Sequence, residues 1–129
     1  MGGGNTVEGI IVKGLGEGAF FMSMPHYKKE IKKKLGFDAY HGTLNIKITE
    51  KKFNSLKNNL SIKINGFKKD NKEFGGAGRK EAKIKNINGA IIMPDTNKHK
   101  DILEFIAPVH IKSTLKVKDG DKIKIELIN

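Results

Sequence analysis

The chain has 129 residues, the length of one domain, and its 37% of hydrophobic residues can fill one modest core. It contains no cysteine, which excludes a disulfide scaffold, thiol catalysis and a thiolate zinc site, and it has no apolar run long enough for a transmembrane helix. The start does not resemble a signal peptide, so we expect a flexible N-terminus over residues 1–6, one domain over residues 7–129 and a cytoplasmic location.

The first part of the chain predicts two strands and a helix. Strands are expected at Val7–Val12 and Ala19–Met24, on either side of the glycine-rich sequence GLGEG. A helix is expected at His26–Leu35, because apolar residues recur at every fourth position and form one stripe, and Gly36 is a natural C-terminal stop. The stripe consists of Tyr27, Ile31 and Leu35.

Two further strands are predicted from alternation of apolar and polar residues, at Thr43–Ile48 and Leu60–Ile64. The segment Asn65–Gly78 that follows is polar and glycine-rich, without a clear period. We interpret it as a mobile loop or the tip of a hairpin.

The last part predicts a hairpin between Ala82–Ile87 and Ala90–Met93, because Asn88-Gly89 is a strong two-residue turn signal. The apolar run Ile102–Ile106 is compatible with a strand or a helix. A short turn or helix and a final strand complete the chain, at Ile111–Leu115 and Lys122–Leu127. Many short strands with little helix are typical of a small closed barrel or a sandwich.

The net charge of +11 invites a nucleic-acid interpretation. All but one of the 25 basic residues are lysine, and Arg79 is the single arginine. Arginine dominates bidentate recognition of bases and phosphates, whereas lysine acts as a solvated point charge. The composition therefore favours general attraction of polyanions over dedicated recognition of DNA or RNA.

Three segments carry residues suited to binding. The loop GLGEG can be a plain β-turn, or it can let backbone N–H groups approach phosphate oxygens. Thr43 and Asn45 share one face of a predicted strand, and their neutral oxygens can hold Mg²⁺ if phosphates supply the charge; the plainer interpretation is a half-solvated strand. Polar residues also gather in Pro94–Pro108, a segment that follows the predicted hairpin.

Several motifs occur in one order along residues 7–127: GLGEGAFF, LGF and the tyrosine of LGFDAYHGTLN, NGAIIMPDTNKH, E-x-IAP in EFIAP, and LKVKDGDKIKI. This order resembles the archaeal-type CTP-dependent riboflavin kinases. The resemblance implies a mainly β fold, a small six-stranded closed barrel of the cradle-loop type with short helical insertions. It also implies transfer of the γ-phosphoryl group of CTP to the 5′-hydroxyl of riboflavin, giving FMN and CDP, with Mg²⁺ as cofactor.

The resemblance assigns roles to residues where these motifs persist. Thr43 and Asn45 match magnesium ligands, and Thr96 and Glu104 match positions that contact the flavin. From its position and chemistry, we hypothesise that Glu104 also orients the ribityl hydroxyl or accepts its proton. The matched nucleotide-binding positions are Gly14, Leu15, Gly16, Glu17, Gly18, Ala19, Val109, His110, Ile111 and Lys112, the last standing where the family commonly has arginine.

The expected partners are CTP or CDP and riboflavin or FMN, with no membrane and no specific nucleic acid, and we expect a monomer. Two alternatives stay open. One is a small basic β-barrel that binds DNA or RNA, which the charge and the LKVKDGDKIKI turn would fit. The other is a flavin-binding relative that keeps the fold without kinase activity.

Overall fold

The computed structural model describes residues 6–14, 25–38, 43–58, 62–64, 67–69, 72–74, 77–94 and 101–128. Within these residues the helices are α2 (Pro25–Leu35), α3 (Glu50–Asn58) and α4 (Ile111–Leu115). The strands are β1 (Thr6–Val12), β2 (Leu44–Lys47), β3 (Ile62–Ile64), β4 (Phe67–Lys69), β5 (Lys72–Phe74), β6 (Ala77–Ile84), β7 (Ile87–Pro94), β8 (Ile102–Ile106) and β9 (Lys122–Leu127). None of these helices combines the length and hydropathy needed to span a membrane.

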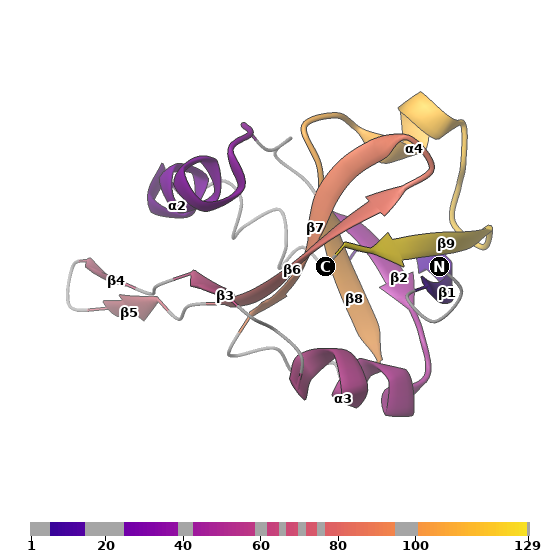
Figure 1. Cartoon of the computed structure of the whole chain (residues 1–129), viewed down its shortest axis with the longest axis horizontal. Helices are drawn as coiled ribbons and strands as arrows, with labels where there is room; N and C mark the ends of the chain where they lie inside the picture. Colours follow the sequence, from indigo (N-terminus) through magenta and orange to yellow (C-terminus); the bar gives the residue numbers. More distant parts are fainter. Residues whose placement is uncertain are drawn as a thin grey trace.

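Six strands form a closed antiparallel barrel in the order β6-β7-β8-β2-β1-β9, and β9 pairs back with β6 to close it. The prediction of a mainly β, six-stranded closed barrel is confirmed. Strand β3 pairs with the start of β6, on the same edge as β9, and the β4–β5 hairpin projects away from the barrel on the left of Figure 1. Because the barrel is closed, each of its six strands has a pairing partner on both edges.

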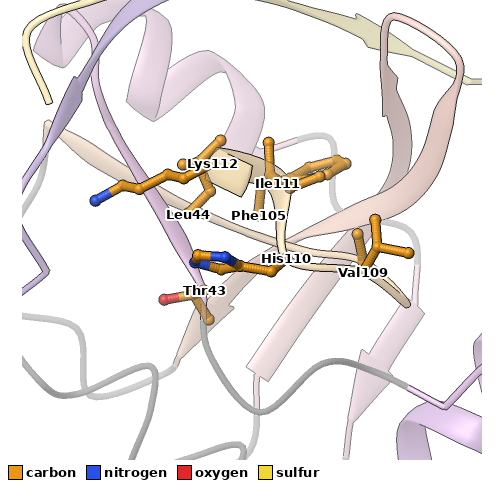
Figure 2. Close-up of a pocket in the computed structure, with 8 residues that line it drawn as sticks. Thr43, Leu44, Phe105, Val109, His110, Ile111 and Lys112 are labelled. Carbon is orange, nitrogen blue, oxygen red and sulfur yellow. The ribbon is translucent and has the colours of Figure 1, made fainter. Parts of the chain in front are cut away.

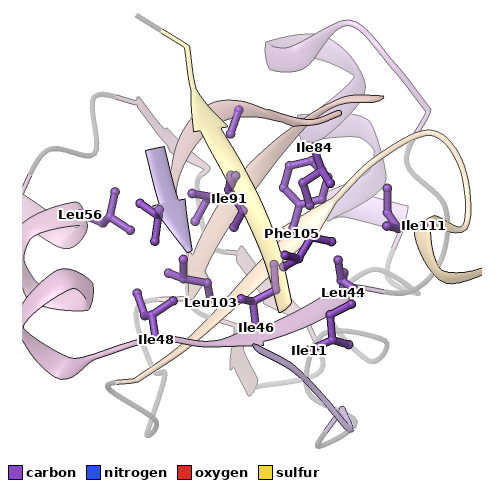
Figure 3. Close-up of a cluster of buried hydrophobic side chains, with 14 of the residues drawn as sticks. Ile11, Leu44, Ile46, Ile48, Leu56, Ile84, Ile91, Leu103, Phe105 and Ile111 are labelled. Atoms are coloured by element: carbon purple, nitrogen blue, oxygen red, sulfur yellow. The ribbon is translucent and has the colours of Figure 1, made fainter. Parts of the chain in front are cut away.

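The core fills the barrel and extends beyond both of its ends (Figure 3). Alternate residues of the strands point inward, as Ile46 on β2 and Leu103 and Phe105 on β8 do. Helix α3 adds Leu56 at one end of the cluster, and α4 adds Ile111 at the other. These two helices therefore cap the barrel interior from opposite sides.

The predicted helix is confirmed as α2, which begins one residue earlier, at Pro25, a residue whose missing N–H costs nothing in a first helical turn. Tyr27 and Ile31 of the predicted stripe are buried. Gly36 ends the helix with φ +82°, and its N–H donates to the carbonyl of Lys32 at 2.9 Å. The side chain of the third stripe residue lies outside the described set.

The hairpin between β6 and β7 exists, but its predicted turn is wrong. The turn is at Lys85-Asn86, since Ile84 pairs with Ile87, and Gly89 lies within β7 opposite Ala82. A Cβ atom at Gly89 would overlap the carbonyl oxygen of Ile106 and the ring of Phe105 on β8. The glycine therefore serves the close approach of two strands, and Lys85 takes the left-handed conformation with φ 53°.

Among the described residues outside 60–78, the remaining expectations concern three predicted strands and two segments whose structure the sequence left open. The strands at Val7–Val12, Thr43–Ile48 and Lys122–Leu127 are confirmed as β1, β2 and β9, with ends shifted by one residue at most. The ambiguous run Ile102–Ile106 is strand β8, and Ile111–Leu115 is helix α4.

Within Asn65–Gly78, the hairpin interpretation is confirmed for β4 and β5, while β6 already begins at Ala77. Of Leu60–Ile64, the described part is β3, and the expected strand Ala19–Met24 lies outside the described residues. Helix α3 has no counterpart among the predictions.

Candidate active site

A pocket of about 110 Å³ lies where the start of β2 meets the segment that enters α4 (Figure 2). It is lined by Thr43, Leu44, Phe105, Ala107, Val109, His110, Ile111 and Lys112. Thr43 was predicted as a metal ligand, and residues 109–112 were predicted to bind the nucleotide. The fold thus brings two predicted groups, distant in sequence, to one cavity.

The apolar lining of the pocket is the end of the barrel core. Leu44, Phe105 and Ile111 belong to the buried cluster, so one wall of the pocket is apolar and closely packed. Sequence reasoning assigned Ile111 to nucleotide binding but gave Leu44 and Phe105 no role in the site. Alternation in β2 could place Leu44 inside, but the position of α4 over that end of the barrel depends on tertiary packing.

His110 and Ser113 are joined at the rim of the pocket. The Nδ1 atom of His110 lies 2.7 Å from Oγ of Ser113, and this hydroxyl donates to the carbonyl oxygen of His110 at 3.2 Å. Which of Nδ1 and Oγ donates in the shorter contact depends on the tautomer of the imidazole. Ser113 therefore orients the imidazole, and the sequence analysis missed this residue.

Lys112 brings a positive charge to the same rim. Its Nζ atom lies 2.6 Å from Oδ1 of Asp119, and both side chains are partly exposed. In Figure 2 the ammonium group extends to the opposite side of the pocket from Val109, whose side chain is 38% exposed. Asp119 is another residue that the sequence analysis did not assign to the site.

A second group of predicted residues gathers on the outer face of β1, β2 and β8. Asn45 pairs with Val12 on one side and with Glu104 on the other. Directly opposed residues of antiparallel strands have their side chains on one face, so the amide of Asn45 and the carboxylate of Glu104 are neighbours. A Cβ atom at Gly14 would lie 2.8 Å from Nδ2 of Asn45, so Gly14 also borders this group.

Glu104 is the one buried polar or charged residue among those described, at 7% exposure. Its neighbour on the far side, Ile92 of β7, is also buried. A buried carboxylate is retained where it has a definite role, because its removal from water is costly. Glu104 is therefore a strong candidate for a functional residue.

The oxygen donors of Thr43 and Asn45 fit a hard cation. The Nδ2 atom of Asn45 faces the carbonyl of Thr43 at 3.4 Å, which leaves Oδ1 of Asn45 as the atom for a metal. The described residues contain no cluster of three or more His, Cys, Asp and Glu that could hold an ion. Neutral oxygen ligands such as those of Thr43 and Asn45 suit Mg²⁺ when phosphates supply the negative charge.

Several predicted site residues lie outside the described residues, so their positions stay predictions. They are Leu15, Gly16, Glu17, Gly18 and Ala19 of the glycine loop, and Thr96. Of that loop, Gly14 is described, two residues after the end of β1 and against Asn45.

Comparison with known proteins gives the family. The matching family model is named CTP-dep_RFKase, is described as a domain of unknown function, DUF120, and covers residues 11–127. The chain is 38% identical over 127 residues to a riboflavin kinase of Methanocella arvoryzae, with 98% of this chain and 58% of the relative covered. It is 42% identical over 125 residues to a riboflavin kinase of Pyrococcus furiosus, with 95% of this chain and 58% of the relative covered.

A riboflavin kinase of Pyrobaculum islandicum is similar in the same way, with 40% identity over 127 residues that include 94% of this chain and 59% of the relative. The chain therefore spans somewhat more than half the length of these relatives. The match extends over nearly all of the barrel, from β1 to β9. By these similarities, this chain belongs to the family of CTP-dependent riboflavin kinases.

Proposed function

We propose that this chain transfers the γ-phosphoryl group of CTP to the 5′-hydroxyl of riboflavin, giving FMN and CDP, with Mg²⁺ as cofactor. The observation that carries the proposal is the convergence of Thr43 with residues 109–112 at one pocket, in a chain of this family. Asn45 of β2 adjoins Thr43. Gly14, which follows β1, and Glu104 of β8 adjoin Asn45, which supports one site for metal, nucleotide and flavin.

Phosphoryl transfer needs positioning and charge neutralisation more than covalent chemistry from the protein. In this proposal, Lys112 faces the anionic nucleotide from the rim of the pocket, and the apolar wall of Leu44, Phe105 and Ile111 excludes water from it. Surface lysines, in a chain of net charge +11, raise the local concentration of an anionic substrate.

Thr43 and Asn45 would hold the Mg²⁺, which neutralises phosphate charge when it is bound. Glu104 is the candidate to hold the ribityl hydroxyl and to accept its proton as the new bond to phosphorus forms. Because the carboxylate is buried beside Asn45, bulk water competes little for this hydrogen bond.

The reaction is tested by a chromatographic assay for FMN. Purified protein is incubated with riboflavin and Mg²⁺, and with CTP or ATP in parallel. We expect FMN with CTP and little FMN with ATP. If a folded preparation forms FMN with neither donor, the kinase proposal is wrong.

The same preparation separates the two alternative functions. A flavin-binding relative without kinase activity would bind FMN, seen as quenched flavin fluorescence, and would leave CTP intact. A nucleic-acid module would keep sequence preference at physiological salt, whereas simple phosphate attraction to the lysines falls steeply with added salt.

The metal assignment predicts the behaviour of Asn45→Ala. Removing Oδ1 should raise the Mg²⁺ concentration needed for half-maximal FMN formation by about 10-fold or more, the size of effect seen when metal-site groups are lost. Asn45 is half-buried at the barrel surface, so the fold should persist, as circular dichroism would verify. An unchanged magnesium dependence would remove Asn45 from the metal site.

The contact between Gly14 and Asn45 predicts the behaviour of Gly14→Ala. The new methyl group would press on the tip of a flexible side chain, so the free energy of unfolding should change by less than about 0.5 kcal/mol. The displaced amide should nonetheless raise the Mg²⁺ requirement several-fold. In an Asn45→Ala background the methyl group has room, so Gly14→Ala should then add nothing; additive effects would contradict this account.

A further inference from the structure

The turn of residues 117–121, with sequence VKDGD, contacts Lys112, at the end of one predicted nucleotide-binding segment, and Ile11, three residues before the other. On one side, the N–H of Val117 donates to the carbonyl of Lys112 at 3.0 Å. On the other side, the N–H of Gly120 donates to the carbonyl of Ile11 at 2.7 Å, and the N–H of Ile11 donates to the carbonyl of Asp121 at 2.9 Å. The turn therefore fixes α4 relative to Ile11 of β1, and Ile11 lies three residues before Gly14 in the sequence.

The turn is itself held in one conformation. The N–H of Lys118 donates to Oδ2 of Asp121 at 2.9 Å, and the N–H of Asp121 donates to the carbonyl of Lys118 at 3.1 Å. Gly120 adopts φ +95°, which glycine allows without strain. Asp119 lies between these residues, so the position of its backbone is fixed by the turn.

Asp119 contacts the pocket through Lys112. Its Oδ1 atom accepts a hydrogen bond from Nζ of Lys112 at 2.6 Å, and Lys112 is then bound to this turn by its carbonyl and by its ammonium group. The two side chains are 35% and 48% exposed. A pair this exposed contributes little to stability, so its main consequence is the placement of the lysine.

We propose that Asp119 is a positioning residue for nucleotide binding, which holds the Lys112 ammonium group at the pocket rim where a phosphate of the nucleotide can meet it. This rests on the proposed function. An ammonium group has three N–H donors, so one bond to Asp119 leaves two for phosphate oxygens. A lysine side chain that is already fixed loses less conformational freedom when the nucleotide binds.

One effect opposes this role, because the carboxylate of Asp119 also repels an anionic ligand. Water reaches about half of the Asp119 side chain and screens that repulsion, and in the proposed complex the ammonium group would lie between the two anions. We therefore expect the gain in nucleotide affinity from a fixed Lys112 side chain to exceed the loss from repulsion by the Asp119 carboxylate. Asp119→Asn separates the two effects, because the amide oxygen can still accept the bond from Lys112 while the charge is gone.

The test measures binding of CDP by isothermal titration calorimetry, and not turnover alone. Asp119→Ala should raise the dissociation constant about 3- to 10-fold, the size expected when one long side chain must be immobilised on binding. Asp119→Asn should bind CDP at least as tightly as the unmodified chain. Equal or tighter binding by Asp119→Ala would overturn the proposal.

A double-mutant cycle distinguishes positioning from a structural role of the turn. In a Lys112→Ala background, Asp119→Ala should cause no further loss of CDP binding; the same loss in both backgrounds would overturn the proposal. Glu126→Ala is the matched control, since it breaks a similarly exposed pair with Lys83 at 3.7 Å on strands β9 and β6 and should leave binding unchanged. If the unmodified chain binds neither CDP nor CTP, the proposed function itself fails, whatever the variants do.

Discussion

Glu104→Gln is expected to lower the turnover number for FMN formation by about 10²- to 10⁴-fold, the usual contribution of a general base. Glutamine has the shape of glutamate and keeps one oxygen acceptor, so the ribityl hydroxyl can still be bound. It cannot take the proton. The KM for riboflavin should therefore change little, and the loss should be in kcat.

The position of Glu104 makes this test interpretable. The side chain is buried between Ile92 and Asn45 on neighbouring strands, so a substitution of equal volume leaves the packing intact. The thermal midpoint of Glu104→Gln should stay close to that of the unmodified chain. Glu8→Gln is a suitable control, because Glu8 is exposed on β1 and pairs with Lys124 at 3.7 Å, away from the pocket.

An unchanged turnover number in Glu104→Gln would remove Glu104 as the base and leave it as an orienting group. An equal fall in both variants would point to a general effect of charge, since Glu8 is not among the residues that line the pocket. A fall confined to Glu104→Gln, with KM preserved, would support proton acceptance at this carboxylate. Rapid-quench measurement of the first turnover would verify that the phosphoryl step is the one slowed.

The sequence predicted those elements whose two faces differ. Helix α2 has one buried stripe that includes Tyr27 and Ile31, so a period near four is visible. Strand β2 alternates buried Leu44 and Ile46 with more exposed neighbours, so a period of two is visible. In both elements one face is buried and the other is in water, so apolar and polar residues recur with a period that is visible in the sequence.

Strand β8 could not be assigned because both of its faces are buried. Leu103 and Phe105 point into the barrel core, while Glu104 and Ile106 are also buried. Such a strand has no alternation, and a short apolar run fits a helix equally well.

Helix α3 was missed for a different reason. It is nine residues long, and of its side chains only Phe53 and Leu56 are buried, which gives too few apolar positions to define a period. The signal that could have found it is Thr49, whose hydroxyl accepts the N–H of Lys52 at 3.2 Å as a helix N-cap does.

The sequence could suggest separate groups of site residues, but it could not show that these groups lie together. The spacing of Thr43 and Asn45 suggested a metal pair, but nothing local linked them to residues 109–112 or to Gly14. Those contacts depend on closure of the barrel, which brings β1, β2 and β8 together. The resemblance to a known family supplied the link, and Asp119 and Ser113 emerged from the hydrogen bonds of α4.

Gly89→Ala is expected to destabilise the fold by about 3 kcal/mol or more, and to lower the thermal midpoint by about 10 °C. The added Cβ atom would overlap the carbonyl oxygen of Ile106 and lie 2.6 Å from Cζ of Phe105, so β7 and β8 would have to separate. This contact involves backbone and a buried ring, neither of which can move aside cheaply. The measurement is urea unfolding followed by circular dichroism.

Lys85→Gly is the variant that makes this result specific to the observed turn. If Asn88-Gly89 were the turn, glycine at Lys85 would weaken a strand, and alanine at Gly89 would strain a loop without touching the core. In the observed hairpin, Lys85 has φ 53°, so glycine there relieves strain and should leave stability within about 1 kcal/mol of the unmodified chain. A large loss in Lys85→Gly together with a small loss in Gly89→Ala would contradict the register of β6 and β7. Because β7 pairs with β8 through Ile92 and Glu104, a shift of that register would also move the candidate base, so stability and catalysis are linked at this glycine.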